Sequence, residues 1–551
     1  MTLAPECAFN WDGAAVASLL FAVPLAITIT ALTVWLYRRS VAKAMLHAAG
    51  EIVPVAAEAS HGAGLAGPLR LTLVNNSVGP PVAQFAQSQA AMRALSGVYA
   101  LAGGVQSVFI TALYLWLNDI DFRPIRTLLL WVPFAWPIFL ALSITATATR
   151  RKKMLVVAGY FVVLFMLDAA ADIFKLRYQP GFGELLLFWV ISLGFPTLVI
   201  VLLGNRAWRA VGFIALFFSF VLVGSYLMGF HGLGCLVFST RSLSLMSNFN
   251  YLLTAWVLLL FFVTWWLFAR MVRRYRHKRY SEQMLLLDSL WLLVTLSEIL
   301  SQMASLGVAS FYYLSGFVAY KIVTHAGLAQ LRAAPAPQSP PALLMLRVFG
   351  FTARTRQLAD QVGHYWRYSG PINMIGGTDL ATSLMEPDEL IQFWSRQLRK
   401  QFIASDADLQ ARLRTLDSAQ DPDLRYRINE FFCHNNTWQA TVKALARRSA
   451  VVLMDLRGFG AKNRGCEFEL QMLLEVIPVA RIVLLVGSGN EPQYLQQVLQ
   501  AAWSKLSTSS PNHALVAPEL PLFQVEDSSA VLPNLLSRLF AAAARTPGDR
   551  P

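Results

Sequence analysis

Residues 451–470 read VVLMDLRGFGAKNRGCEFEL, and this stretch decides the fold of the C-terminal part of the chain. It begins with four apolar residues that lead to Asp455, passes through a glycine-containing turn, and opens a helix with the apolar spacing that starts at Cys466. A short, continuously apolar strand that is followed by a helix is typical of a parallel sheet covered on both faces.

The same strand-and-helix unit recurs on both sides of this stretch. Apolar runs typical of buried strands lie at 343–350, 372–377, 451–456, 481–487 and 522–526. Helical periodicity fills the intervals at 354–367, 438–448, 465–476, 491–505 and 529–543, and a helical insertion is expected over 387–430. The sequence therefore predicts a doubly wound α/β domain with a parallel sheet over residues 342–545.

The residues before 334 have the composition of a membrane protein. The 551-residue chain is 56% hydrophobic and only 14% charged, and most of its net charge of +14 belongs to residues 1–333. Basic residues in an apolar region are typical of the cytoplasmic flanks of membrane helices. The sequence has no basic stripe with interleaved aromatic residues, the pattern that is typical of nucleic-acid binding. We expect the lipid bilayer as a partner and no nucleic acid.

Seven apolar runs are long enough to span a bilayer: 14–37, 97–117, 127–147, 154–174, 184–203, 210–229 and 251–269. Basic clusters flank alternate ends of these runs, which predicts an inner (plasma) membrane protein with its N-terminus outside and its C-terminal domain in the cytoplasm. Residues 284–323 fit either a tight helical hairpin, which gives nine spans, or an amphipathic helix followed by a re-entrant segment. The predicted polytopic, all-α membrane domain therefore covers 1–325 with seven to nine helices.

Two segments have the composition of linkers. Residues 326–341 contain AAPAPQSPP, a Pro-rich spacer that separates the two predicted domains. Residues 44–95, with Pro80-Pro81 and many small residues, are expected to be a partly disordered cytoplasmic loop.

The four cysteines divide according to this topology. Cys7 and Cys235 fall outside, where an oxidising compartment would allow them to pair. Cys433 and Cys466 face the reducing cytoplasm, and Cys466 is expected to be a small buried packing residue because no histidine follows it closely.

Small and charged residues follow the predicted strands of the α/β domain. Glycine lets a backbone amide approach a phosphate or a ribose, and an acid or a guanidinium can hold a hydroxyl or a phosphate. These residues meet at the carboxyl edge of the sheet, where doubly wound proteins bind ligands. The predicted ligand-binding residues are Phe349, Gly350, Gly376, Gly377, Asp379, Asp455 and Arg457.

Residues 438–470, WQATVKALARRSAVVLMDLRGFGAKNRGCEFEL, resemble the distal half of a TIR (Toll/interleukin-1 receptor) domain. In that family a helix that ends in serine, here Ser449, precedes an apolar strand, and a Cys-x-x-Glu-Leu element begins the next helix. The resemblance implies a TIR-like, flavodoxin-like fold that becomes active by self-association, with NAD as its substrate. It also implies that Glu469 is the essential residue of an NAD glycohydrolase and that the setting is defence or stress response.

Physical chemistry gives Glu469 a coherent task beside this resemblance. Cleavage of the bond between nicotinamide and ribose passes through a ribosyl cation, which a carboxylate at the pocket wall can stabilise. Neither a metal nor a tightly bound cofactor is then required. Glu467 lies on another face of the helix and is the weaker candidate, while a carboxylate in a first helical turn is also favoured by the helix dipole alone.

Acidic residues within the apolar region form a second group of candidates. Asp168 and Asp172 share one helix face, and Glu298 maps toward the same leaflet. Intramembrane acids are typical of an ion path or a ligand cavity. A transporter with a regulatory cytoplasmic domain would need a hydrated cavity that joins Asp168 to Glu298.

The preferred interpretation is a membrane-anchored, self-associating effector whose cytoplasmic domain binds NAD or a related nucleotide and hydrolyses it. The alternative is a non-enzymatic receptor or adaptor that binds a nucleotide or a protein without turnover. The two interpretations differ in whether Glu469 faces a pocket lined by Phe349, Gly376, Asp379 and Asp455 or is sealed within a helix interface.

Overall fold

The computed structural model of the chain describes most of the α/β region and several of the apolar helices. The described residues are 11–47, 69–74, 83–146, 155–156, 158–160, 162–163, 166, 215, 218–219, 221–224, 243–333, 339–347, 353–376, 393, 402–434, 436–461, 463–487, 492–515, 518–525 and 528–544.

The chain divides into two compact units. The helical unit comprises Met1–Leu36, Ala94–Ala334 and Leu384–Ile391, and the α/β unit comprises Tyr37–Arg93, Pro335–Ser383 and Gln392–Pro551. This division differs from the expected boundaries, because a segment near the N-terminus belongs to the α/β unit.

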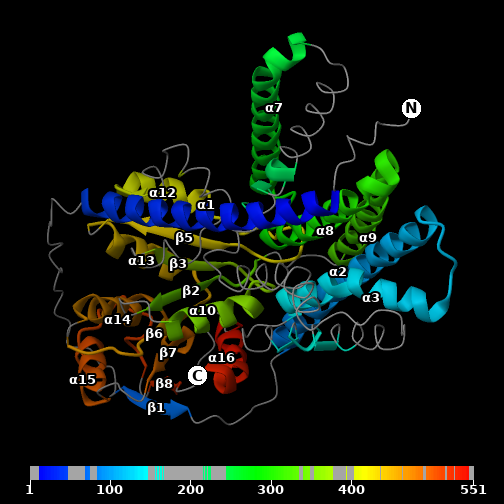
Figure 1. Cartoon of the computed structure of the whole chain (residues 1–551). Helices are drawn as coiled ribbons and strands as arrows, with labels where there is room; N and C mark the ends of the chain where they lie inside the picture. The colour runs from blue at the N-terminus through cyan, green and yellow to red at the C-terminus, as the bar shows by residue number, and fades with distance from the viewer. Residues whose placement is uncertain are drawn as a thin grey trace. The chain divides into compact units, whose positions relative to one another are not determined.

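The α/β unit is built on a sheet of eight strands, and every strand pair in it is parallel (Figure 1). The strand order is β1-β8-β7-β6-β2-β3-β5-β4. The strands are β1 (Arg70–Val74), β2 (Leu343–Arg347), β3 (Ile372–Gly376), β4 (Phe402–Ile403), β5 (Ile428–Cys433), β6 (Val451–Asp455), β7 (Ile482–Val486) and β8 (Glu519–Gln524).

The central strands form because their apolar runs are buried on both faces. Every residue of β6 and β7 is buried, as expected for strands covered by helices on both sides. If β1, β4 and β5 are left aside, the remaining strands have the doubly wound order in which the chain first moves from β2 to β3 and then reverses through β6, β7 and β8. The reversal places the topological switch point between β2 and β6.

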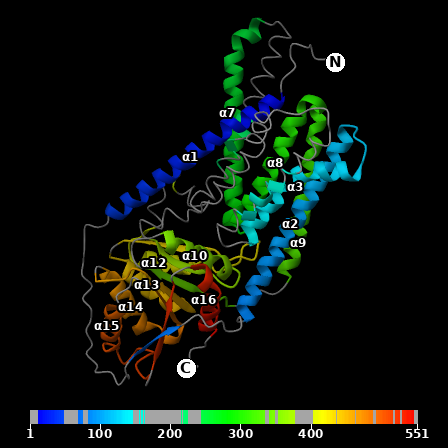
Figure 2. The same ribbon diagram turned by 60° about the horizontal axis from the view of Figure 1, so that its bottom comes forward.

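Two groups of helices cover the sheet. Helices α13 (Trp438–Arg448), α14 (Arg464–Val476) and α15 (Pro492–Trp503) pack in succession, and α10 (Ala353–Trp366) packs against α16 (Ser528–Ala543). Figure 2 shows α13, α14 and α15 in a row along one side of the strands, with α16 on the other side. The five helices expected between the strands are therefore confirmed.

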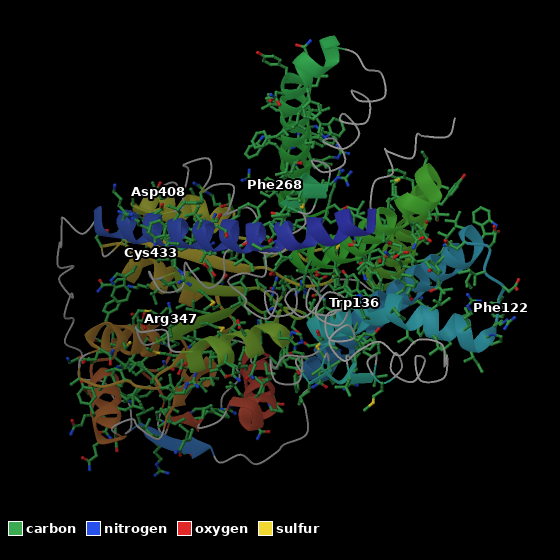
Figure 3. All side chains as sticks on the ribbon, viewed as in Figure 1. Phe122, Trp136, Phe268, Arg347, Asp408 and Cys433 are labelled. Carbon is green, nitrogen blue, oxygen red and sulfur yellow. The ribbon has the colours of Figure 1, made fainter. Side chains whose placement is uncertain are left out.

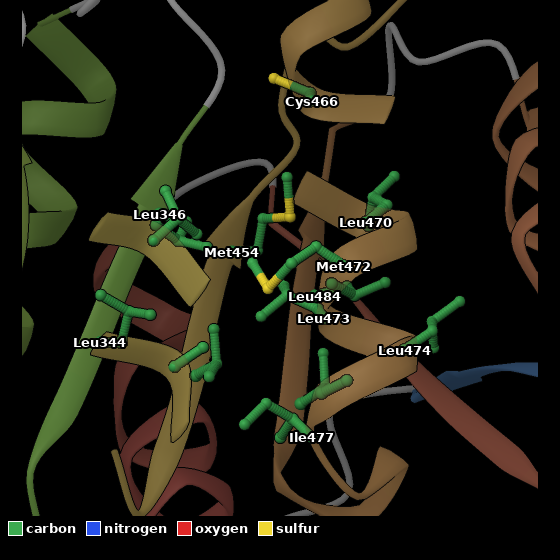
Figure 4. Packing of buried hydrophobic residues seen from close by; sticks show 14 of the residues in the cluster. Leu344, Leu346, Met454, Cys466, Leu470, Met472, Leu473, Leu474, Ile477 and Leu484 are labelled. Carbon is green, nitrogen blue, oxygen red and sulfur yellow. The ribbon is translucent and has the colours of Figure 1, made fainter. Parts of the chain in front are cut away.

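The main core lies between α14 and the central strands. Leu470 and Leu473 of α14 pack with Leu346 of β2, Met454 of β6 and Leu484 of β7, and all five are almost fully buried (Figure 4). Complete burial of each such side chain contributes about 1.5–3 kcal/mol, so this contact fixes the start of α14 against the strand ends.

The insertion expected to be helical over 387–430 also contributes strands. Among its described residues, α12 (Asp406–Arg414) is helical and begins at Ser405, whose Oγ accepts a hydrogen bond from the Asp408 amide at 3.2 Å. Strand β4 precedes α12, and β5 begins at Ile428 and extends the sheet beyond β3. The prediction missed β5 because its polar first residues break the apolar run.

The expected linker over 44–95 is wrong where the structure describes it. Arg70–Val74 forms β1, which pairs along its whole length with β8, and the helix α2 (Ala83–Leu117) already begins at Ala83. The strand forms because the β8 backbone supplies its hydrogen-bond partners, and β8 is too far along the chain for the local composition of 44–95 to indicate this pairing. The helix α9 (Leu314–Arg332) likewise continues into the expected linker at 326–341.

The helical unit contains helices of membrane-spanning length. Five described helices are long and apolar enough to cross a bilayer, with candidate spans at Phe21–Val41, Ala83–Leu117, Pro124–Ala146, Asn248–Arg276 and Glu282–Met303. These spans belong to α1 (Trp11–His47), α2, α3 (Pro124–Ala146), α7 (Leu243–Arg276) and α8 (Glu282–Leu306). Figure 3 shows side chains projecting around α7, and only 6% of its most apolar window is buried. The runs expected at 184–203, and most of those at 154–174 and 210–229, lie outside the described residues.

Residues 284–323 form a helical hairpin. Helix α8 begins at Ser281, whose Oγ accepts a hydrogen bond from the Met284 amide at 3.0 Å, and the 3₁₀ turn Gly307–Tyr313 joins it to α9. Asp288 near the start of α8 pairs with Lys321 of α9 at 2.5 Å. The described residues therefore form a helix–turn–helix hairpin, and α9 is not among the five described helices that are long and apolar enough to cross a bilayer.

Candidate functional site

A pocket lies at the topological switch point of the sheet. Its lining comes from the middle and the last residues of adjacent strands and from the helix that follows β2, namely Met345, Leu346, Arg347, Leu358, Ala359, Met374, Leu453 and Asp455. It is a small, mainly apolar pocket whose lining includes two charged residues, Arg347 and Asp455. Doubly wound proteins bind their ligands at this position.

The two charged lining residues are the last residues of two neighbouring strands. Arg347, which is labelled in Figure 3, ends β2. It is the register partner of Asp455, which ends β6. Asp455 is 6% exposed and accepts hydrogen bonds from Arg457, at 2.8 Å from Nε and 2.7 Å from Nη2. The Arg457 amide donates a third bond to the same carboxylate at 3.1 Å. A two-pronged, partly buried pair of this kind is geometrically well defined.

The turn after β6 is shaped by Gly458. Its φ of +83° lies in the left-handed region, where a side chain is strained. The Leu456 amide donates to the carbonyl of Leu485 at 2.8 Å, so the chain stays attached to β7 while it turns. The turn thereby holds Arg457 over the end of its own strand.

Glu469 lies in the second turn of α14 and is buried. Its side chain is 5% exposed, and its Oε2 atom has no hydrogen-bond partner among the described residues. Burial raises the pKa of the Glu469 carboxyl to about 8, and the nearby positive charge of Arg347 opposes this shift. At neutral pH the acid is therefore mainly protonated, and Arg347 links it electrostatically to the pocket, although Glu469 itself is not a lining residue.

The neighbours of Glu469 have ordinary packing roles. The hydroxyl of Tyr494 on α15 donates to Glu467 at 2.7 Å, which ties that carboxylate to the adjacent helix. Cys466 is fully buried in the core, in agreement with the expected packing role (Figure 4). Of the two acids Glu467 and Glu469, Glu469 is therefore the buried one, and its Oε2 atom has no hydrogen-bond partner among the described residues.

The other expected ligand-binding residues are only partly within the described region. Gly376 ends β3, where an added side chain would meet the ring of Phe432 at 2.9 Å. The residues Phe349, Gly350, Gly377 and Asp379 lie outside the described residues. The structure therefore brings Asp455 and Arg457 together and links them, through Arg347, to Glu469.

Arg347 is the charged lining residue that the sequence interpretation missed. The strand LLMLR ends in a charged residue, just as VVLMD ends in Asp455. A charge that terminates a buried apolar strand marks the carboxyl edge of the sheet. The expected strand 343–350 continues to Gly350, which places Arg347 inside the strand and not at its end.

Only one of the three expected membrane acids, Glu298, lies within the described region. Asp168 and Asp172 lie outside it, while Glu298 is partly buried on α8. The described acid with a clear partner is Asp288, which pairs with Lys321 across the hairpin. A partly buried ion pair between two helices accounts for this acid by its structural role.

Chemically, the switch-point site combines two guanidinium groups, one carboxylate and one buried carboxylic acid. Within the described residues, no three His, Cys, Asp or Glu side chains gather as a metal site would require. Comparisons with protein-family models, curated proteins and solved structures find no match to this chain. The function must therefore be argued from the site itself.

Proposed function

We propose that this protein is a membrane-anchored effector whose TIR-like, flavodoxin-like α/β unit binds NAD and hydrolyses its N-glycosidic bond. The supporting observation is the buried acid Glu469, whose pKa is raised to about 8 beside Arg347 of the switch-point pocket. Strongly shifted acids in such surroundings are typical of functional sites.

The proposed reaction needs only the residues of this chain and water. The bond between the ribose C1′ and the ring nitrogen breaks, and both electrons go to the nitrogen, so nicotinamide leaves as a neutral molecule. Water then adds to C1′ and releases a proton. A carboxylate near C1′ stabilises the ribosyl cation that forms between these steps.

The pyridinium charge of the substrate would bring Glu469 into its active state. A nearby cation favours the ionised carboxylate and therefore lowers the pKa of an acid that burial has raised. Substrate binding would then release a proton from Glu469 and leave a carboxylate beside the reacting bond. Arg347, in the pocket lining, would favour the same ionised state.

The membrane part supplies the proposed setting. The basic clusters that flank the apolar helices support an inner-membrane protein with its α/β unit in the cytoplasm. Self-association of the membrane helices would bring several α/β units together and activate them. Defence or stress response is the proposed biological role.

Nicotinamide release by the full chain tests this proposal. The protein is reconstituted either as single copies in lipid nanodiscs or as clusters in lipid vesicles. Nicotinamide is measured after incubation with NAD. Glu469→Gln is expected to lower the rate about a hundredfold or more. The matched variant Glu467→Gln changes an acid of the same helix that is held by Tyr494, and it is expected to retain the rate. No release by the clustered wild-type protein would sink the hydrolase proposal.

A second function is favoured by the sealed position of Glu469. Because Glu469 is 5% exposed and is not a lining residue of the pocket, the unit would serve as a nucleotide-binding adaptor without turnover. Calorimetry distinguishes the two functions, since an adaptor binds the nucleotide through Arg347 and Arg457 while Glu469→Gln leaves its affinity unchanged.

A further inference from the structure

The segment that joins the first two membrane-length helices belongs to the α/β unit. Tyr37–Arg93 contains the end of α1, all of β1 and the first turns of α2. We use the word strap for its described residues Leu69–Val74 and Ala83–Arg93.

The strand of the strap is paired along its whole length with β8. All five residues of β1 have register partners in β8, from Arg70 opposite Glu519 to Val74 opposite Phe523. The Arg70 amide also donates to the carbonyl of Pro518 at 3.0 Å. Leu69, directly before β1, is 5% exposed and belongs to the main core, so backbone bonds hold the strand and burial holds the residue that leads into it.

The helical part of the strap packs on α10 and α16. Phe85 is 4% exposed, and its ring lies 5.7 Å from the ring of Tyr365 and 6.1 Å from that of Phe540. One turn further along α2, the hydroxyls of Ser88 and Ser369 are 2.6 Å apart. Arg93 lies close enough to Tyr365 to oppose the rise in pKa that burial causes in this phenol. The contact therefore extends over the whole segment Ala83–Arg93.

Helix α2 does not end where the strap ends. It is one helix of 35 residues from Ala83 to Leu117, and its residues from Ala94 onward belong to the helical unit. A bilayer needs about 20 helical residues to be spanned, so α2 has about four turns to spare. The residues that pack on α10 and α16 lie in about the first three turns of the helix.

Helix α10 connects the strap to the pocket. Its last turn carries Tyr365 and Trp366, and Trp366 stacks on Phe540 at 4.6 Å. Its middle carries Leu358 and Ala359, which line the switch-point pocket beside Arg347. A shift of the first turns of α2 would therefore bear on the same rigid helix that forms one wall of the pocket.

We propose that the strap transmits displacements of the membrane helix α2 to α10 and so regulates the pocket at the switch point. The device does not depend on which ligand the pocket binds. A helix whose apolar length differs from the bilayer thickness tilts or shifts, and a thicker bilayer draws more of α2 into the lipid. The strap would then be pulled against α10, and the packing of Leu358 and Ala359 would change.

Hydrogen exchange of the full chain tests this device without any ligand. The protein is reconstituted in short-chain and in long-chain phosphatidylcholine nanodiscs, and the exchange rates of the α10 amides are compared. We expect these rates to differ about threefold or more between the two bilayers, while those of β7 stay the same. Equal α10 rates in both bilayers would overturn the proposal.

Two variants of α2 separate the strap from the rest of the helix. Phe85→Ala removes the buried ring and is expected to abolish the difference between the bilayers at α10. Phe109→Ala changes a ring of the same helix that is 45% exposed, and it should keep the difference. If Phe85→Ala lowers the overall protection of β7, Phe85→Leu replaces it, because leucine keeps the bulk and loses the ring contacts.

A cross-link completes the test. Ser88→Cys with Ser369→Cys places two thiols where the hydroxyls are 2.6 Å apart. Cys433 and Cys466 are buried, and Cys7→Ser with Cys235→Ser removes the two cysteines that are expected to lie outside. In the Phe85→Ala background, oxidation is expected to restore the bilayer dependence at α10, and reduction should remove it again. A restored dependence in the single-cysteine chains would contradict transmission through this contact.

Discussion

The α/β unit and the helical unit use the same apolar residues in opposite ways. In the α/β unit the strands β6 and β7 are buried throughout, and Leu473 of α14 is fully buried. In the helical unit α7 is equally apolar, but residues such as Leu259 and Trp266 are more than half exposed. Apolar side chains that are exposed along a whole helix indicate that lipid surrounds the helix. Apolar side chains that are buried between a sheet and its helices indicate that water surrounds the domain.

Buried polar side chains with hydrogen-bond partners occur in both units. Inside the helical unit, Gln106 of α2 donates to the Thr295 hydroxyl at 2.8 Å and to the Trp291 carbonyl at 3.1 Å. In the α/β unit buried acids pair with arginines, as Asp423 does with Arg425 and Asp455 does with Arg457. Glu469 is also buried, and its Oε2 atom has no hydrogen-bond partner among the described residues.

The largest expected effect comes from paired leucine truncations. Leu473→Ala should lower the free energy of unfolding of the α/β unit by about 3 kcal/mol, because it opens a cavity in a close-packed core. Leu259→Ala on α7 should change the stability in nanodiscs by less than about 0.5 kcal/mol, because lipid fills the space that the side chain leaves. Urea denaturation followed by hydrogen exchange in each unit measures both. Equal losses would break the contrast between the two units.

The next effect is a pH dependence that arises at Glu469. Its pKa is about 8 in the folded chain and has an ordinary value of 4.5, so the folded state binds more protons between these values. The free energy of unfolding should therefore fall as the pH rises from about 5 to about 8, by up to about 1.4 kcal/mol per pH unit.

Two variants show which acid causes this slope. Glu469→Gln should remove the slope and stabilise the α/β unit at pH 8, since an amide has no ionised form to desolvate. Glu467→Gln should retain the slope of the unmodified chain. A slope that persists in Glu469→Gln would show that another group is responsible, and the measurement is urea denaturation at successive pH values.

The smallest effect concerns packing inside the helical unit. A methyl group at Gly103 would lie 2.4 Å from the Trp291 ring, so Gly103→Ala should lower the melting temperature in detergent at a cost of about 1–2 kcal/mol. Gly104→Ala has no atom within 4 Å and should leave stability unchanged or raise it, because alanine favours the helix by about 1 kcal/mol. The reverse order would show that α2 and α8 do not pack as described.

Much of the fold was predictable because burial leaves a local pattern. The runs that became β2, β3, β6 and β7 are mainly apolar, and β7 is apolar at every position. The helices between them repeat at helical spacing. The pattern failed for β1 and β5. The run RLTLV of β1 reads as a loop, and it becomes a strand only because the β8 backbone lies beside it.

The candidate site was predictable in part for the same reason. Asp455 was identified because a charge at the end of an apolar strand must lie at the carboxyl edge of a parallel sheet. Glu469 was selected through the resemblance to TIR domains, and its burial could not be read from the alternation of residues in α14. Arg347 was missed because the expected strand continues to Gly350, and its relation to Glu469 arises only when β2 and α14 come together.

The sequence by itself determined that one part of this chain is built for lipid and another for a parallel sheet, because composition and periodicity reflect the solvent that each residue meets. Tertiary structure alone decided that β1 and the first turns of α2 belong to the α/β unit, that Arg347 stands opposite Asp455, and that burial raises the pKa of Glu469. Strand pairing and desolvation depend on residues far apart in the chain, and no local pattern encodes such neighbours.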